Sequence, residues 1–465
     1  MVLSFLDREH SIAKPGFSRW LVPPAALAIH LCIGQVYAFS VFKNPLVEKF
    51  DTSATAISVV FSIAIVMLGL SAAVGGKWME RSGPRKAMFL SAVCFSAGLL
   101  VGSVGVATEQ LWLLYLGYGV IGGIGLGIGY ISPVSTLIKW FPDRPGLATG
   151  MAIMGFGGGA FIASALTAEL LTSYTNITAP GLPTDAIVPT FITLGLGYLL
   201  FMMFGVFTIR VPPEGWKPAG YLPKTDHGNK MMTTANVSAD NSIKTRQFWF
   251  LWVVLFCNVT AGIGILEQAS PMIQDFFPGQ VTAASAAGFV GLLSLSNMAG
   301  RFVWSSTSDY LGRQRTYLLY LGIGALLFFS LATAGNTSVP VFVLLACLAI
   351  SFYGGGFATV PAYLKDLFGT FQVGAIHGRL LTAWSAAGVA GPLIVNLLID
   401  SQRSNGVSGA AAYRPALLVM VGVLLVGFVA NLLVRPVAEK FHEPAAAADA
   451  ESLRTTAGAG VKGQR

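Results

Sequence analysis

Two short stretches decide the fold, "GKWMERSGPRK" (76–86) and "SSTSDYLGRQR" (305–315). Each follows a long apolar segment, and each places an acidic residue three positions before a glycine. At an offset of 229 residues, Glu80 matches Asp309, and the two glycines match as well. One acid–glycine turn is a weak signal, but two copies in register predict that the chain consists of two related halves.

The composition is that of a membrane protein. Of the 465 residues, 54% are hydrophobic and only 11% are charged, whereas a soluble domain is about a quarter charged. The net charge of +8 lies between apolar segments and forms no basic face with interleaved aromatic residues, so nucleic-acid binding is not expected. The four cysteines lack metal-ligand spacing, and no acid pair or nucleophile–base set is present. We therefore expect no metal, no cofactor and no enzymatic activity.

Twelve apolar stretches are long enough to cross a bilayer. We expect the Gly-rich fourth and fifth spans to be the least regular. The predicted spans are 20–42, 55–79, 87–106, 110–138, 146–171, 188–209, 247–274, 282–307, 316–335, 339–366, 374–399 and 414–434.

Lys and Arg concentrate in every second loop and in the central linker, while alternate loops such as 172–187 and 275–281 carry none. Cytoplasmic loops carry the excess of positive charge, so both termini and the linker are predicted to face the cytoplasm, with the protein in the cytoplasmic (inner) membrane. The predicted organisation is a six-helix half (1–209), a linker (210–246), a second six-helix half (247–435) and a disordered tail (436–465).

Arg301 is the most informative residue. It precedes Asp309 by eight residues, which places it about 12 Å into a hydrocarbon core roughly 30 Å thick. A cation at that depth costs at least ~2.5–3.5 kcal/mol. Snorkelling toward the cytoplasm is one explanation, and a structural ion pair is another, although Glu267 lies at the wrong depth. We favour a water-filled cavity in which the guanidinium receives an anion.

Other polar and aromatic residues are candidates to line such a cavity. Asn297 precedes Arg301 by one helical turn and continues its polar stripe, and an amide beside a guanidinium fork suits a carboxylate. For the residues of span one, hydrogen bonding between helices is an equal alternative, and His30 is either a titrating group or a neutral packing residue. The candidate substrate-binding set is Arg301, Asn297, Tyr130, Tyr37, Tyr353, Gln35, His30 and Trp384.

Twelve spans in two parallel halves with matching turns resemble the major facilitator superfamily. The resemblance implies an all-α membrane fold that works by alternating access, with the two turns acting in conformational change. The residues to which this gating role is transferred are Glu80, Gly83, Arg85, Asp309, Gly312 and Arg313.

Two further stretches, "YISPVSTLIKWFPDRPGLATGMAIMGFGGGA" (130–160) and "NMAGRFVWSSTSDYLGR" (297–313), resemble the oxalate/formate antiporter family and the related monocarboxylate transporters. That resemblance implies that Arg301 binds a substrate carboxylate. Oxalate exchangers of this type carry a lysine in span eleven, where this chain has Trp384, so one arginine favours one carboxylate. Animal monocarboxylate transporters carry an aspartate where this chain has Asn297, so a coupled proton would need another group, such as Glu267 or His30.

The sequence thus predicts a monomeric secondary transporter of small monocarboxylates such as lactate, pyruvate or formate, with a coupled proton or counter-anion. Two alternatives stay open. One is a dicarboxylate antiporter of the oxalate/formate type, and the other is a non-transporting carboxylate sensor.

Overall fold

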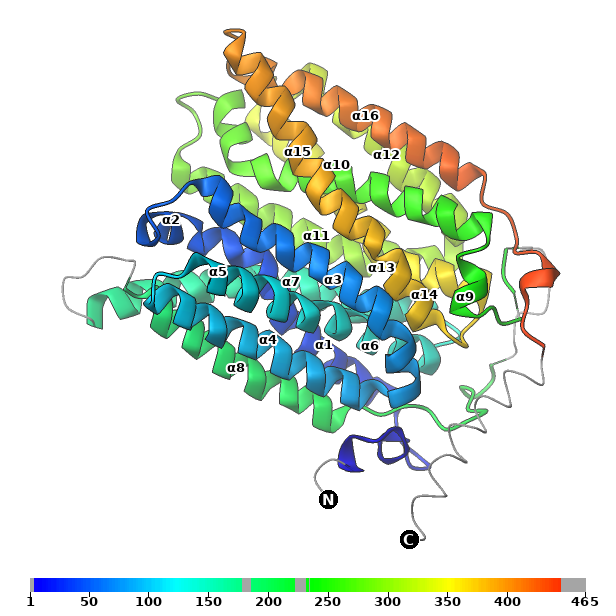
Figure 1. Cartoon of the computed structure of the whole chain (residues 1–465). Coiled ribbons are helices and arrows are strands. Elements are labelled where there is room, and N and C mark those ends of the chain that lie inside the picture. Colours follow the sequence, from blue (N-terminus) through cyan, green and yellow to red (C-terminus); the bar gives the residue numbers. More distant parts are fainter. Residues whose placement is uncertain (1–3, 178–184, 222–230, 234, 445–465) are drawn as a thin grey trace.

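A computed structural model describes residues 4–177, 185–221, 231–233 and 235–444, and within these ranges the regular elements are helices joined by turns and loops, with one isolated bridge between Ile12 and Val211. The predicted all-α membrane fold is confirmed. Most helices run roughly along one direction and form a bundle (Figure 1).

Twelve helical segments have the length and hydropathy to cross a membrane, which confirms the predicted count. Each lies over a predicted span and is generally a few residues longer, because the helices continue past the apolar stretch into polar ends. The segments are Arg19–Lys49, Thr55–Ser82, Pro84–Ala107, Leu111–Trp140, Pro145–Asn176, Ile187–Thr208, Arg246–Phe276, Ser285–Leu311, Arg313–Ala334, Val339–Phe368, Val373–Ser404 and Ala410–Leu432.

Several spans are built from more than one element. Span one joins α1 (Val22–Ile33), a 3-10 stretch η4 (Gly34–Phe39) and α2 (Ser40–Lys49). Span four joins α5 (Leu111–Leu114), a π-helical stretch η5 (Tyr115–Gly122) and α6 (Gly123–Trp140). Span eleven is divided into α14 (Val373–Leu380) and α15 (Thr382–Ser404).

The remaining spans are single helices. They are α3 (Ala54–Ser82), α4 (Pro84–Ala107), α7 (Pro145–Ile177), α8 (Ile187–Thr208), α10 (Arg246–Phe276), α11 (Ala283–Leu311), α12 (Arg313–Ala334), α13 (Val339–Phe368) and α16 (Ala410–Leu432). The expected irregularity of span four is confirmed by its π-helical stretch, whereas that of span five is wrong, because α7 runs unbroken through its glycines.

The repeat seen in the sequence is present in the backbone. Helices α3 and α11 each have 29 residues, and each ends at a glycine with a left-handed conformation, Gly83 at φ 88° and Gly312 at φ 85°. Such a φ favours glycine, which has no Cβ to clash, so these two glycines are required by the turn. Both halves turn into their third span in the same way.

The two six-helix halves meet along α7 and α11 and along α3 and α14. A Cβ at Gly150 of α7 would collide with Ser305 of α11, and one at Gly378 of α14 would collide with the Ala72 carbonyl of α3. Small residues at crossings allow close helix approach. We call the end of the bundle that holds the turns at Gly83 and Gly312 the linker end. It lies at the lower right in Figure 1, beside α9 (Ala239–Ser242).

The chain between the halves includes α9, and the chain after α16 includes a short 3-10 turn, Glu439–Phe441. Asn241 of α9 donates a hydrogen bond to Glu443, so the linker between the halves contacts the segment that follows α16. The tail predicted to be disordered lies largely outside the described residues, since the description ends at residue 444.

Candidate functional site

Arg301 lies on α11 with its side chain fully buried, at 0% exposure. Its Nε donates to Asn297 Oδ1 at 3.0 Å, and its Nη1 donates to the backbone carbonyl of Ile153 on α7 at 3.4 Å. Its Nη2 has no hydrogen-bond partner among the described residues. The guanidinium therefore does not snorkel, and one face of its fork is unsatisfied.

Two aromatic rings enclose the guanidinium. Its central carbon lies 5.5 Å from the ring centroid of Phe156 on α7 and 5.3 Å from that of Phe357 on α13. A cation over an aromatic face gains electrostatic attraction, and more when it is desolvated. The prediction of a water-filled cavity around Arg301 is wrong for this conformation, because aromatic rings from both halves enclose the guanidinium. Phe156 was missed because it stands in a glycine run that reads as packing.

The other candidate aromatic residues gather around Arg301. Tyr37 Oη and Tyr353 Oη lie 3.1 Å apart and join span one to span ten, across the two halves. The Trp384 ring lies 5.3 Å from that of Tyr130 and 4.5 Å from that of Phe357. Both halves thus contribute to one aromatic cluster with a single buried cation at its centre.

His30 completes the cluster from α1. Its ring meets that of Tyr130 edge-on, with centroids 5.3 Å apart, and it interacts electrostatically with Arg301. His377 of α14 also packs against Tyr130, with ring centroids 5.9 Å apart. The structure therefore places His377 beside the cluster.

Unpartnered buried polar atoms are concentrated here. Buried polar groups are normally hydrogen-bonded, and exceptions need an explanation. Within the described residues, those of the cluster without a partner are Arg301 Nη2, Tyr130 Oη, His30 Nε2, Trp384 Nε1 and both ring nitrogens of His377. No carboxylate of the described part of the chain forms an ion pair with Arg301. The arrangement matches a small ligand with an anionic group.

Two residues that the sequence singled out lie apart from this cluster. Gln35 is buried, and its Oε1 accepts a hydrogen bond from Tyr118 within the first half. Glu267 of α10 is exposed and accepts from Asn396 at 3.3 Å. Gln35 Oε1 therefore makes a hydrogen bond between helices, the alternative considered for span one, while its buried Nε2 has no partner in the described chain.

Glu80 connects the two halves at the linker end. Its carboxylate accepts from Ser135 Oγ at 2.9 Å and from Lys139 Nζ at 2.5 Å, both on α6. It also accepts from the backbone amide of Gly374, at the start of α14 in the other half, at 2.9 Å. A carboxylate at a helix N-terminus is stabilised by the free amides there.

Asp309 makes the equivalent contact from the second half to the first. Its two oxygens accept from the backbone amides of Gly146 and Leu147, at the start of α7, at 2.8 and 2.9 Å. Arg313 donates to Asp309 and, at 3.1 Å, to Asp366 of α13. Each acid of the repeated turn thus holds a helix of the opposite half, in keeping with the predicted gating role.

Arg85, also predicted to act in gating, contacts its own half. Its guanidinium donates to the carbonyls of Phe5, His10 and Ile209, and it packs 4.1 Å from the Phe5 ring. These contacts fasten the N-terminal segment to the end of span six.

The linker adds a third contact between the halves. Asp240 of α9 accepts from Lys77 of α3 and from Arg379 of α14, the latter at 2.7 Å, and Arg379 also donates to the Ala239 carbonyl. Two hydrogen bonds lower the pKa of Asp240 to about 2, and the bond from Lys77 has a larger effect than the bond from Arg379. This pairing depends on contacts between segments that are distant in the sequence.

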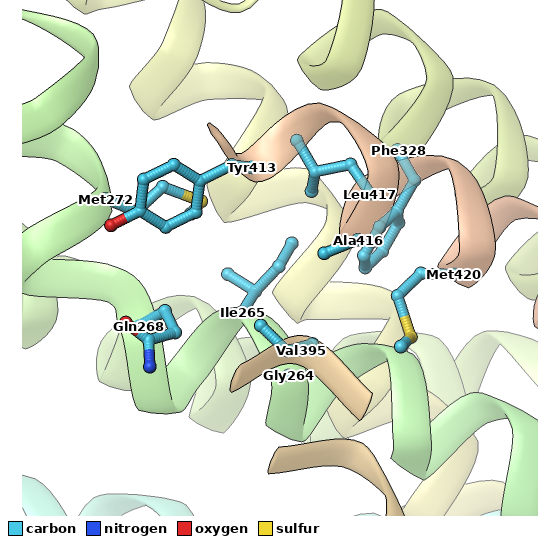
Figure 2. A pocket seen from close by; sticks show the side chains of 10 residues that line it. All are labelled: Gly264, Ile265, Gln268, Met272, Phe328, Val395, Tyr413, Ala416, Leu417 and Met420. Carbon is cyan, nitrogen blue, oxygen red and sulfur yellow. The ribbon is translucent and has the colours of Figure 1, made fainter. Parts of the chain in front are cut away.

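A cavity in the second half is distinct from the cluster (Figure 2). Its polar side chains are already paired, Gln268 with Asn396 and Tyr413 with Asp275. It is lined by Gly264, Ile265, Gln268, Met272, Phe328, Val395, Tyr413, Ala416, Leu417 and Met420. This mostly apolar lining does not suit a carboxylate.

The repeat shows that the fold does not require a cation at position 301. At the offset of 229 that aligns the two turns, the counterpart of Arg301 is Ala72. Both positions sit at equivalent crossings, since a Cβ at Gly150 would approach the Arg301 carbonyl and one at Gly378 the Ala72 carbonyl. An alanine occupies this helix crossing in the first half, so packing at the crossing does not explain the arginine in the second half.

Comparisons with known proteins agree with the fold. The chain is 25% identical to the oxalate:formate antiporter of Oxalobacter formigenes over 379 residues, which cover 80% of this chain and 83% of that protein. It is 24% identical to apicoplast pyruvate carrier 1 of Toxoplasma gondii over 430 residues, covering 83% and 76%. The structure of the E. coli fucose:proton symporter FucP superposes with a TM-score of 0.64 at 15% identity, covering 89% of this chain and 99% of that one. The profile of the Major Facilitator Superfamily matches residues 25–392. The chain belongs to the Major Facilitator Superfamily, whose members are transporters rather than enzymes.

Proposed function

We propose that this protein is a secondary transporter of small monocarboxylates, such as lactate, pyruvate or formate, and that Arg301 binds the carboxylate. The observation that carries the proposal is the buried guanidinium of Arg301, whose Nη2 lacks an acceptor within the described chain. Leaving a buried charged donor unpaired costs more than leaving a neutral one. A carboxylate satisfies both the charge and the free side of the fork.

Alternating access follows from the two halves. In the described conformation the linker end is held closed by Glu80, Asp309 and Asp240, while the candidate site lies between the halves. The proposed moving units are 1–209 and 247–435, with the linker and both termini on the cytoplasmic side of the inner membrane. Two relatives support the substrate class, since one is named as an oxalate:formate antiporter and the other as a pyruvate carrier.

The single cation favours a monocarboxylate over a dianion. Span eleven carries Trp384 and Ser385 where the family resemblance implies a lysine, and Ser385 donates to the Ile65 carbonyl at 2.9 Å. The oxalate/formate-type exchanger is the second candidate, favoured by the relative of that name. Counterflow of labelled oxalate compared with labelled lactate separates the two.

The test is uptake and counterflow of labelled pyruvate and lactate in proteoliposomes. Arg301→Ala should abolish both, and Arg301→Lys should do nearly the same, because an ammonium lacks the planar fork. Arg435→Ala removes an exposed arginine beyond the last span and serves as the matched control. Monodispersity and thermal unfolding report folding in each variant. Full transport by Arg301→Ala contradicts the proposal, and binding without transport in the wild type favours the sensor.

A further inference from the structure

His30, the buried histidine of span one, has one ring nitrogen in a hydrogen bond to a backbone carbonyl and one that can bind a proton. His30 Nδ1 lies 3.2 Å from the Ala26 carbonyl. A carbonyl only accepts, so Nδ1 is assigned the hydrogen and Nε2 of the neutral ring keeps its lone pair. Nε2 is buried and forms no hydrogen bond of good geometry in the described chain, although the Tyr130 backbone also lies near the ring. An additional proton on His30 would bind at Nε2.

The surroundings of His30 decide when that proton binds. Three titratable or charged side chains of other helices interact with His30: Arg301 of α11, Tyr130 of α6 and His377 of α14. Helix α7 faces it with Gly155. In the described residues none of these neighbours is a carboxylate. An imidazolium here would stand beside the Arg301 guanidinium with no counter-ion, and a buried unpaired charge is costly.

A bound carboxylate reverses this balance. With an anion at Arg301, the protonated Nε2 gains an acceptor and the repulsion from the guanidinium is offset. Substrate therefore favours protonation, and by reciprocity protonation favours substrate. One anion and one proton add no net charge, so the loaded and the empty site carry the same charge through the conformational change.

We propose that His30 is the proton-binding residue of this carrier, and that its Nε2 takes up one proton as the carboxylate binds to Arg301, so that the two cross the membrane together. The inference rests on the proposed function and adds its coupling. His377 is the less suitable group, because neither of its ring nitrogens has a partner in the described chain to orient the ring, whereas the Ala26 carbonyl fixes Nδ1 of His30.

The experiment separates exchange from proton-driven transport in proteoliposomes. Exchange of labelled pyruvate at equal concentrations needs no net proton movement, whereas accumulation against a gradient, driven by an acidic exterior, needs the coupled proton. The wild type should accumulate pyruvate and acidify an entrapped pH dye. His30→Gln should lower the ratio of accumulation to exchange at least tenfold relative to the wild type, as expected for about 1.4 kcal/mol or more of coupling, whatever its effect on exchange itself. His10→Gln, which removes an exposed histidine of the N-terminal segment, is the control.

The outcomes are distinguishable. Accumulation and internal acidification that persist in His30→Gln overturn the proposal, as does their loss in His377→Gln alone. Exchange without any response of the wild type to a pH gradient overturns the coupling but leaves the carboxylate carrier intact. Absence of exchange in the wild type removes the proposed function itself. Should His30→Gln fail to fold, proton uptake on addition of pyruvate to the detergent-purified wild type decides, with one proton per anion expected and none contradicting the proposal.

Discussion

The Gly146 amide and the Asp309 carboxylate, which belong to opposite halves, are joined by a 2.8 Å hydrogen bond at the linker end. The repeat supplies the mirror contact, in which the Gly374 amide donates to Glu80 at 2.9 Å. Each acid ends the second span of its own half and caps a helix of the other half. The first turn of a helix favours negative charge through its free amides and its dipole, so these contacts stabilise the conformation closed at this end.

Asp309→Asn should open the linker end. A hydrogen bond to a charged group contributes about 1.5–3 kcal/mol, so its loss should shift the equilibrium about tenfold or more. Spin labels at Arg144→Cys and Arg315→Cys, in a background with the four native cysteines replaced by alanine, report the distance between halves. The matched control is Asp275→Asn, which breaks an ion pair with Arg403 inside one half. An unchanged distance distribution in Asp309→Asn contradicts the role.

Glu80→Gln should have the same effect, and the two substitutions should add. Glu80 and Asp309 share no hydrogen-bond partner, and independent sites are nearly additive. The same spin-label pair measures the double variant. A double variant that opens no further than either single one would show that the two contacts act as one unit.

Asp240→Asn should also favour opening, and this contact should be independent of pH between 5 and 8. Because the pKa of Asp240 is lowered to about 2, its contribution is fully present above the ordinary aspartate pKa of about 3.9. It is lost only as the pH falls toward about 2. Label distances in the wild type at pH 5 and pH 8 test this. A widening at pH 5 that Asp240→Asn abolishes would refute it.

The sequence was sufficient for the spans and turns because both are local. Hydropathy over about twenty residues finds a helix that crosses the membrane, and the glycine after Glu80 or Asp309 marks a left-handed turn. The partners of these acids were not predictable, since Asp309 binds an amide 163 residues away and Glu80 one 294 residues away. The burial of Arg301 within the bundle agrees with its predicted position eight residues before Asp309. Its enclosure by Phe156 and Phe357 depends on how α7 and α13 pack, which no local pattern contains.

Tyr130→Phe should separate ligand binding from stability. The Tyr130 hydroxyl is buried and forms no hydrogen bond of good geometry in the described chain, although it interacts with the Arg301 guanidinium. Removing it relieves a desolvation cost and loses this weak contact, so the unfolding temperature of the unliganded protein should change little. If this hydroxyl donates to the bound carboxylate, pyruvate binding should weaken by about 1.5–3 kcal/mol, the range for a hydrogen bond to a charged group, or roughly 12- to 160-fold in Kd. Tyr317→Phe is the opposite control, because the Tyr317 hydroxyl donates to the Gly356 carbonyl, so its loss should lower stability and leave binding unchanged. Thermal unfolding with and without pyruvate measures both quantities. A destabilised Tyr130→Phe with unchanged pyruvate affinity would assign that hydroxyl to packing and remove it from the site.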